Sequence, residues 1–236
     1  QAGLVFDVKT DWNRKGSFFE LRPLVGNNGQ SGAMVRFGGS TTDESFKYFI
    51  GAKTGQTDLG MESPTPNAQT LNNLNRNTSL LARFKARIDS DEFGLTASHV
   101  NNSFQLPQTQ NNFDAGVRQN QNDFSTAVMG TWKHPIDEKS ELLMGLAYVK
   151  NRQLVGNNGI FTNQQIFDAG ASEELAAEGL PANPLMPGSP YLPTTALTLE
   201  QIQPTMRYTH RFSDKHTLVA GIDADFIHSN QKVDIL

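Results

Sequence analysis

Residues 201–226 read QIQPTMRYTHRFSDKHTLVAGIDADF, and this stretch decides the fold class. Apolar and polar residues alternate with a period of two as far as Phe212, and again after a polar turn at 213–216. Successive side chains of a β-strand point to opposite faces, so each half has one apolar and one more polar face. The stretch therefore predicts two antiparallel strands joined by a tight turn.

Other compact polar turns recur along the chain, and each of them after the first joins two stretches with the same alternation. These turns lie at 13–16, 40–45, 89–92 and 134–140. Between the hairpins lie three longer segments, 55–78, 101–123 and 151–198, which are rich in Asn, Gln, Gly and Pro. In the last we expect a short helix at 169–178 and an extended Pro-rich stretch at 181–193. Short turns on one side and long connections on the other are typical of a bacterial transmembrane β-barrel.

Two of the expected strands are less regular. Pro23 weakens the one at 18–25, because proline cannot donate a ladder hydrogen bond. Residues 142–149 are apolar on both faces, which also suits a buried strand of a soluble β-sandwich. The other expected strands are 33–37, 46–54, 81–88, 93–98 and the two halves of 201–226.

Composition excludes several classes of protein. The 236 residues contain no Cys, which rules out disulfide frameworks and thiolate metal sites. The net charge of −4 gives no support for nucleic-acid binding, which requires a basic patch. No apolar run approaches the ~20 residues of a membrane helix. The apolar content of 37% fits either a barrel or a soluble β protein.

Both ends of the sequence read as strands already under way, at Gln1 and at Leu236. No signal peptide is visible, although a secreted barrel is made with one. We therefore expect this chain to be an interior piece of a longer protein.

Several motifs, in order along most of the chain, resemble those of TonB-dependent outer-membrane receptors. Residues 3–10 (GLVFDVKT) are similar to the last strand of the receptors' plug, and 36–39 (RFGG) to the first barrel hairpin. Residues 57–60 (TDLG) resemble the opening of the next outer loop. Residues 106–108 (LPQ) with 115–119 (AGVRQ) resemble a loop of the large receptors that carry an N-terminal carboxypeptidase-like domain. Residues 216–223 (HTLVAGID) resemble a strand of many nutrient receptors.

The resemblance implies an all-β fold, an antiparallel transmembrane β-barrel of which this chain is an incomplete portion. Residues 1–12 would be the last strand of the plug, and 13–236 the N-terminal part of the barrel with long extracellular loops. About nine strands of a barrel of about 22 would be present. The implied function is active import of a nutrient across the bacterial outer membrane, without an enzymatic step, a cofactor or a metal.

The implied partners are the TonB complex, outer-membrane lipids and a ligand. TonB would act through parts outside this chain, and the ligand is a small molecule, a glycan or a peptide. A surface lipoprotein is a further candidate partner, and nucleic acid is not one.

Aromatic, amide and basic residues in the long connections are the candidates for binding this ligand, because loops on a rigid scaffold often carry function. Solvated surface loops are also rich in such residues. The candidates are Phe104, Asn111, Phe113, Arg118, Phe161 and Tyr191.

Charged residues on the polar strand faces are expected to face the lumen, because a charge on the lipid side costs ~2–4 kcal/mol near the midplane. They are either ordinary lining, paired with plug carboxylates or with one another, or a basic surface for anionic ligands. They are Arg83, Lys85, Arg87, Arg207, Arg211, Asp223 and Asp225. Trp132, Tyr208, Phe212 and Phe226 are expected in the aromatic girdles, or alternatively in the core of a soluble sandwich.

Catalysis and metal binding are not expected. The five His residues lack zinc-site spacing. His210 would lie on the apolar face, pointing away from Asp223 and Asp225. The alternatives to an active transporter are a passive porin-type channel and a secreted soluble β-sandwich that acts as a binding module.

Overall fold

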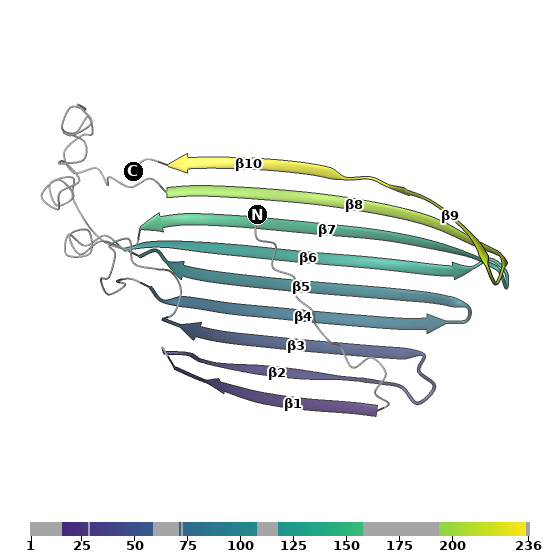
Figure 1. Cartoon of the computed structure of the whole chain (residues 1–236), viewed down its shortest axis with the longest axis horizontal. Helices are drawn as coiled ribbons and strands as arrows, with labels where there is room; N and C mark the ends of the chain where they lie inside the picture. Colours follow the sequence, from purple (N-terminus) through teal and green to yellow (C-terminus); the bar gives the residue numbers. More distant parts are fainter. Residues whose placement is uncertain are drawn as a thin grey trace, which may run out of the picture.

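The computed structural model shows a single antiparallel β-sheet (Figure 1). It describes residues 16–27, 29–58, 71, 73–107, 118–157 and 194–234. The strands are β1 (Gly16–Val25), β2 (Ser31–Ser40), β3 (Phe46–Thr57), β4 (Asn75–Ile88), β5 (Asp91–Gln105), β6 (Gln119–Pro135), β7 (Ser140–Asn157), β8 (Thr194–Ser213), β9 (His216–Asp223) and β10 (Phe226–Asp234). Each strand from β1 to β8 pairs with the next, and both β9 and β10 pair with β8. The all-β, antiparallel prediction is confirmed.

Connection length differs between the two ends of the sheet, except that the connection 26–30 is as short as 41–45. The connections at 41–45, 89–90, 136–139 and 214–215 are short and lie at the end that we call the turn end (Figure 1). The opposite end, the loop end, carries the connections 26–30, 58–74, 106–118 and 158–193. The hairpins predicted around the turns at 40–45, 89–92, 134–140 and 213–216 are therefore present, whereas the turn predicted at 13–16 lies outside the described residues except for Gly16. The expected plug strand at 1–12, the helix at 169–178 and the Pro-rich stretch at 181–193 lie outside the described residues.

The strands extend further toward the loop end than the sequence pattern indicated. β4 begins at Asn75, β5 runs to Gln105 and β7 runs to Asn157, all inside segments expected to be loops. These extensions carry Asn, Gln, Ser and Thr on both faces, so apolar alternation is absent there. Backbone ladder hydrogen bonds do not require apolar side chains, and pairing continues without the pattern.

The expected single strand after residue 216 is divided at Ala224 and Asp225. Its two parts, β9 and β10, keep one register against β8, because Thr205 pairs with Asp223 and Ile202 with Phe226. The Ala224 amide donates to the Pro204 carbonyl at 3.1 Å. In an antiparallel pair the amide and carbonyl of one residue point toward the same neighbouring strand. Because proline has no amide hydrogen, Pro204 cannot donate the second hydrogen bond of the pair to the Ala224 carbonyl. Pro204 therefore interrupts the ladder at this point.

One small aromatic cluster packs on the sheet near β1. The rings of Phe18 and Phe49 lie 6.4 Å apart, and Phe49 is 5% exposed. A Cβ placed on Gly38 would come within 2.8 Å of the Phe18 ring, so the glycine leaves the space that this ring occupies. Phe49 is the only buried hydrophobic residue in the described part of the chain.

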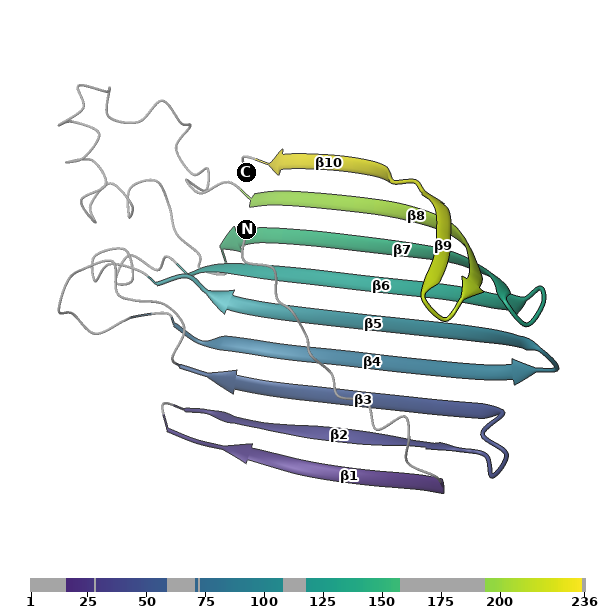
Figure 2. The ribbon, with the colours of Figure 1, turned by 45° about the vertical axis from the view of Figure 1, so that its right-hand side comes forward.

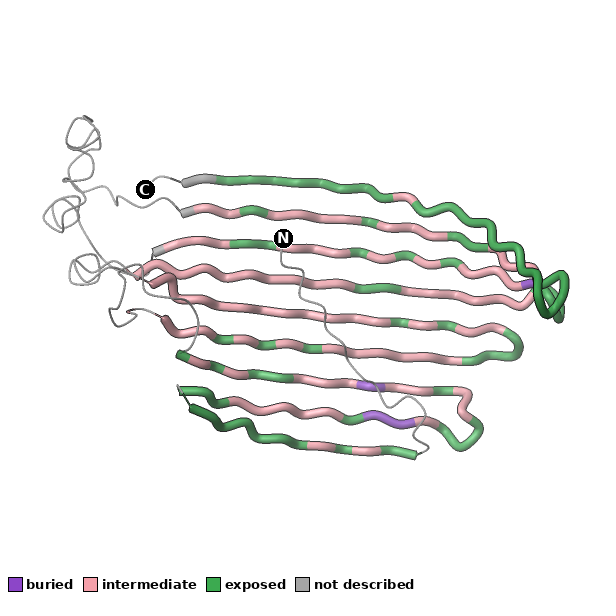
Figure 3. Tube along the Cα trace, viewed as in Figure 1, coloured by how far each residue is buried: buried purple, intermediate pink, exposed green. Residues whose placement is uncertain are grey.

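The sheet is a single layer over the described residues. Most strand positions are half-buried or exposed, as Figure 3 shows along every strand. Figure 2 shows β9 and the adjoining end of β8 curling out of the run of the other strands. The sheet is not closed, since β1 pairs only with β2, and β10 only with β8. The described residues include no helix that is long and apolar enough to cross a membrane.

Candidate functional site

Register places most of the large apolar side chains of the central strands on one face, which we call the apolar face. Directly paired residues share a face, and three adjacent rows of such pairs carry no charge. The rows are Phe46–Ala86–Phe93–Trp132–Met144–Met206–Ile222, Tyr48–Phe84–Leu95–Gly130–Leu146–Pro204 and Ile50–Ala82–Ala97–Val128–Tyr148–Ile202–Phe226. No described element covers these rows, and Leu146 is 56% and Ile222 74% exposed.

Three aromatic residues of the apolar face have polar tips with hydrogen-bond partners, Trp132 and Tyr208 at its turn-end border and Tyr48 in its middle row. The hydroxyls of Tyr48 and Ser17 lie 3.2 Å apart. The Trp132 indole donates to Asp91 Oδ2 at 3.0 Å. The Tyr208 hydroxyl donates to Ser140 Oγ at 3.3 Å. The rings of Trp132 and Tyr208 thus have their bodies on apolar surface and their tips at a polar end, which is the amphipathic arrangement of aromatic residues at a membrane–water boundary.

The four expected girdle residues all lie on the apolar face, but they do not share a level. Trp132, Tyr208 and Phe212 lie toward the turn end. Phe226 pairs with Ile202 and lies toward the other border of the apolar rows. The tyrosine of that row, Tyr148, donates its hydroxyl to Glu200 Oε1 at 3.4 Å.

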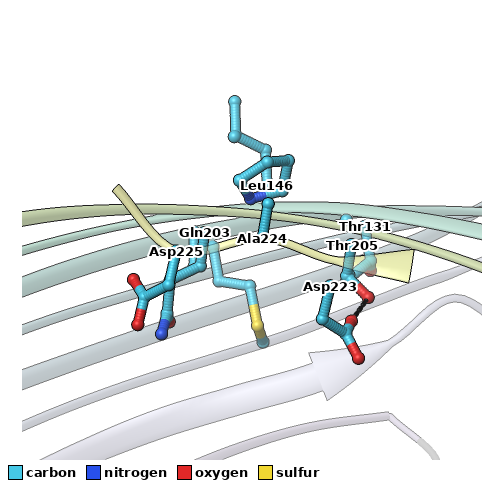
Figure 4. Close-up of a pocket in the computed structure, with 11 residues that line it drawn as sticks. Thr131, Leu146, Gln203, Thr205, Asp223, Ala224 and Asp225 are labelled. Carbon is cyan, nitrogen blue, oxygen red and sulfur yellow. Dashed lines mark hydrogen bonds between the residues drawn. The ribbon is translucent and has the colours of Figure 1, made fainter. Parts of the chain in front are cut away.

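The opposite face, the polar face, carries the charged residues predicted to share a side of the strands. Lys85 Nζ lies 2.7 Å from Glu92, and Lys133 Nζ lies 2.6 Å from Glu141. Glu20 accepts hydrogen bonds from both Arg22 and Arg36. Register places Arg83, Lys85, Arg87, Arg207, Arg211 and Asp223 together on this face, and Asp225 extends to the same side (Figure 4). It is therefore lined by a ladder of ion pairs between neighbouring strands.

The expected pairing of Asp223 and Asp225 with arginines is not what the structure shows. Asp223 accepts from Thr205, and both oxygens of Asp225 lie 2.7 Å from Gln201 Nε2. Arg207 and Arg211 form no ion pair with any residue that the structure describes.

A cavity of about 390 Å³ lies where β8 meets the interruption between β9 and β10. In Figure 4 the side chains of Gln203, Thr205, Asp223 and Asp225 extend to one side of the sheet and Leu146 to the other. Its polar wall therefore belongs to the polar face and offers carboxylate, amide and hydroxyl groups.

Only two of the ligand-binding candidates fall in the described part of the chain. Phe104 pairs with Asn75 and Gln121, and Arg118 immediately precedes β6. Both flank the connection 106–118, so the structure places them together at the loop end. Asn111, Phe113, Phe161 and Tyr191 lie outside the described residues.

Two clusters with titratable groups at the turn end were not found from the sequence. His134 Nδ1 lies 2.5 Å from Asp91 Oδ1, beside Trp132. Ser140 Oγ lies 2.8 Å from His210 Nδ1 and donates to Asp137 Oδ2 at 3.0 Å. Such contacts join residues far apart in sequence, so only the strand register could have predicted them.

The Ser140 cluster lacks the geometry of a nucleophile. In a catalytic triad the histidine stands between the serine and the carboxylate, whereas here the serine stands between His210 and Asp137. Ser140 is only 4% exposed, which keeps substrates from its hydroxyl. His210 and Asp223 lie on opposite faces, as the alternation predicted.

The described residues hold no group of three or more His, Cys, Asp or Glu side chains placed to bind a metal ion. No protein-family model matches the chain, and no curated protein matches it in sequence.

Proposed function

We propose that the chain forms part of a TonB-dependent transporter in the bacterial outer membrane, which imports a nutrient into the periplasm. The observation that carries this proposal is the uncovered, uncharged apolar face opposite a charged one. A soluble protein would cover such a face with a second layer, whereas a barrel presents it to lipid. The family motifs in the sequence favour a transporter over other barrels.

The dimensions of the apolar face suit a bilayer. On β4, Leu80 and Ile88 lie in the two rows that border the uncharged rows, and at ~3.4 Å per residue these bordering rows are roughly 27 Å apart. A tilted strand lowers that height toward the ~25 Å apolar band of outer-membrane barrels. Asp91 and His134 bound the face at the turn end, and Lys150 and Glu200 bound it at the loop end.

In this proposal the polar face lines the lumen. The ladder of ion pairs there is shielded from lipid, and Arg207 and Arg211 face the space that a plug occupies. The long connections at the loop end hold the ligand with the plug, and TonB pulls on the plug to admit it. The ligand is a small molecule, a glycan or a peptide, taken up without chemical change.

Two substitutions with equal exposure test the orientation of the sheet. Leu95 on the apolar face and Met129 on the polar face are both 44% exposed. We expect Leu95→Arg to cost ~2–4 kcal/mol near the bilayer midplane and to remove most folded protein from membranes. We expect Met129→Arg to be tolerated. Folded protein in floated membranes is the measurement, and loss with Met129→Arg but not with Leu95→Arg would contradict the proposal.

A measurement of conductance distinguishes the transporter from a porin, because both would be built from a β-sheet of this kind. The full-length protein, reconstituted in a planar bilayer in potassium chloride, should show little steady current because a plug fills the lumen. A large steady current would assign a passive channel. If the protein neither enters the bilayer nor needs detergent to stay in solution, it is a soluble β-sandwich.

A further inference from the structure

Just beyond the apolar rows, toward the loop end, the same face becomes polar and basic. Three further rows of paired residues lie there on β4 to β10. They are Leu80–His99–Thr126–Lys150–Glu200–His228, Thr78–Asn101–Phe124–Arg152–Thr198–Asn230 and Arg76–Ser103–Asn122–Leu154–Ala196–Lys232. Arg76, Lys150, Arg152 and Lys232 form what we call the basic rim.

The charge of the rim is not balanced within these rows. Glu200 is the one carboxylate among the described residues of the three rows, and it is held by Lys150 at 2.7 Å. Arg76 and Arg152 are exposed and form no ion pair with any residue that the structure describes. The rim therefore carries a net positive charge on an open surface.

The position of the rim identifies the kind of partner that it fits. The row containing Tyr148 ends the apolar face, and Lys150 is the next residue of β7 on that face. A lipid layer that covers the apolar rows brings its headgroups to this level, where arginine and lysine can extend their charged ends.

The spacing of the charges indicates a layer of anions and not one bound ion. Arg76 and Arg152 lie on strands β4 and β7, three strand spacings apart, which is roughly 14 Å at ~4.8 Å per strand. A single phosphate requires convergent donors, whereas headgroups present many phosphates along a plane.

We propose that the basic rim binds the phosphate groups of anionic lipids in the leaflet at the loop end of the sheet. This inference rests on the proposed membrane position of the apolar face. Guanidinium groups suit it, since they bind phosphate oxygens in a bidentate manner. The lipid then fixes the height at which the protein sits in the bilayer.

The test compares two double variants that remove the same charge from opposite faces. Arg76→Gln with Arg152→Gln removes two rim arginines, and Arg87→Gln with Arg207→Gln removes two exposed arginines of the polar face. The full-length protein, in mixed micelles, is titrated with phosphatidylglycerol or with the zwitterionic lipid phosphatidylethanolamine. The readouts are the rise in melting temperature and the lipids retained in native mass spectrometry.

We expect phosphatidylglycerol to raise the melting temperature of the unmodified protein more than phosphatidylethanolamine does. The rim variant should lose at least half of that difference and retain fewer phosphatidylglycerol molecules, whereas the polar-face variant should keep both. High salt should reduce the difference, and inorganic phosphate alone should produce none.

Equal loss in both double variants, or stabilisation by inorganic phosphate alone, would overturn the rim proposal. Vesicle flotation separates this failure from failure of the proposed function. Protein that floats with vesicles but responds equally to both lipids refutes the rim alone. Protein that does not float with vesicles of either lipid refutes the membrane position and the rim with it.

Discussion

At the turn between β6 and β7, the carboxylate of Asp137 accepts hydrogen bonds from the Lys139 amide at 2.7 Å and the Ser140 hydroxyl at 3.0 Å. Both bonds favour the charged form of the carboxylate, and the bond from the Lys139 amide has the larger effect. Together they hold the pKa of Asp137 below its usual 3.8. His210 acts in the same direction through its charge. The turn therefore depends on an ionised carboxylate.

The consequence for pH follows from the sign of that shift. A carboxyl whose pKa is lower in the folded state stabilises the fold above its unfolded pKa, and this contribution is lost as pH falls through the folded value. We expect Asp137→Asn to reduce the melting temperature by a constant amount above pH ~5. The difference from the unmodified protein should shrink below pH ~4.

Melting curves between neutral pH and pH ~3 check this expectation. Glu138→Gln is the matched control, because it removes the neighbouring charge, and the Glu138 side chain makes no hydrogen bond or ion pair in the described part of the chain. A melting difference for Asp137→Asn that is unchanged down to the lowest pH would show that ionisation of Asp137 does not support the turn.

Which residues share a face could be predicted from the sequence, whereas their partners could not. Alternation is a local property, so spacing alone predicts the correct faces of Lys85, Arg207 and Tyr208. Contacts such as Trp132 with Asp91 depend on the register between strands. Register is set by turn geometry and ladder bonds that composition does not encode.

At the scale of single elements, β8 shows where pattern and pairing diverge. Its turn-end half alternates clearly and was predicted, but its loop-end half from Thr194 carries mixed residues and was assigned to a loop. Pro204 fits the alternation, yet it removes a backbone donor, and alternation does not indicate which neighbouring strand loses the hydrogen bond. The split between β9 and β10 was therefore missed.

Replacing Pro204 with valine should repair this ladder. The new amide points toward Ala224, whose own amide already donates to residue 204 at 3.1 Å. We expect a gain of ~0.5–1.5 kcal/mol from the hydrogen bond, opposed by ~0.4–1 kcal/mol from the greater freedom of the unfolded chain. Net stability should therefore change little.

Hydrogen exchange can detect the new ladder hydrogen bond in this variant, although the melting temperature should change little. The amides of residues 204 and 224–226 should exchange more slowly in Pro204→Val, while Ile202→Val on the same strand should leave the amide of Ala224 unaffected. Rapid exchange at position 204 in the folded variant would show that the proline is not what divides β9 from β10.

At the scale of the whole molecule, the sheet has two kinds of surface that need a partner. The apolar face needs a covering layer, which in our proposal is lipid. The edges at β1 and β10 present unpaired backbone groups, a template for pairing with other chains. The sequence pattern predicts individual hairpins, but closure and strand number depend on tilt and shear over the complete barrel.

The 236-residue chain produced by itself should aggregate in two separable ways. Detergent covers the apolar face and should suppress the first, but it leaves the strand edges free, so we expect oligomers to persist in micelles. Ala224 donates toward β8, and alternate residues of a strand point to opposite sides, so the amide of Ser229 points away from β8 toward the free edge. Proline there removes an outward donor and no ladder bond.

We therefore expect Ser229→Pro to lower the oligomer fraction in detergent, measured by light scattering after gel filtration, and Ser229→Ala to leave it unchanged. Equal oligomer fractions in all three chains would show that β10 is not the site of association. A detergent-free monomer with intact β structure would go further, because an apolar face of this size cannot remain uncovered in water. That outcome would require a second layer over the apolar rows and would refute the barrel itself.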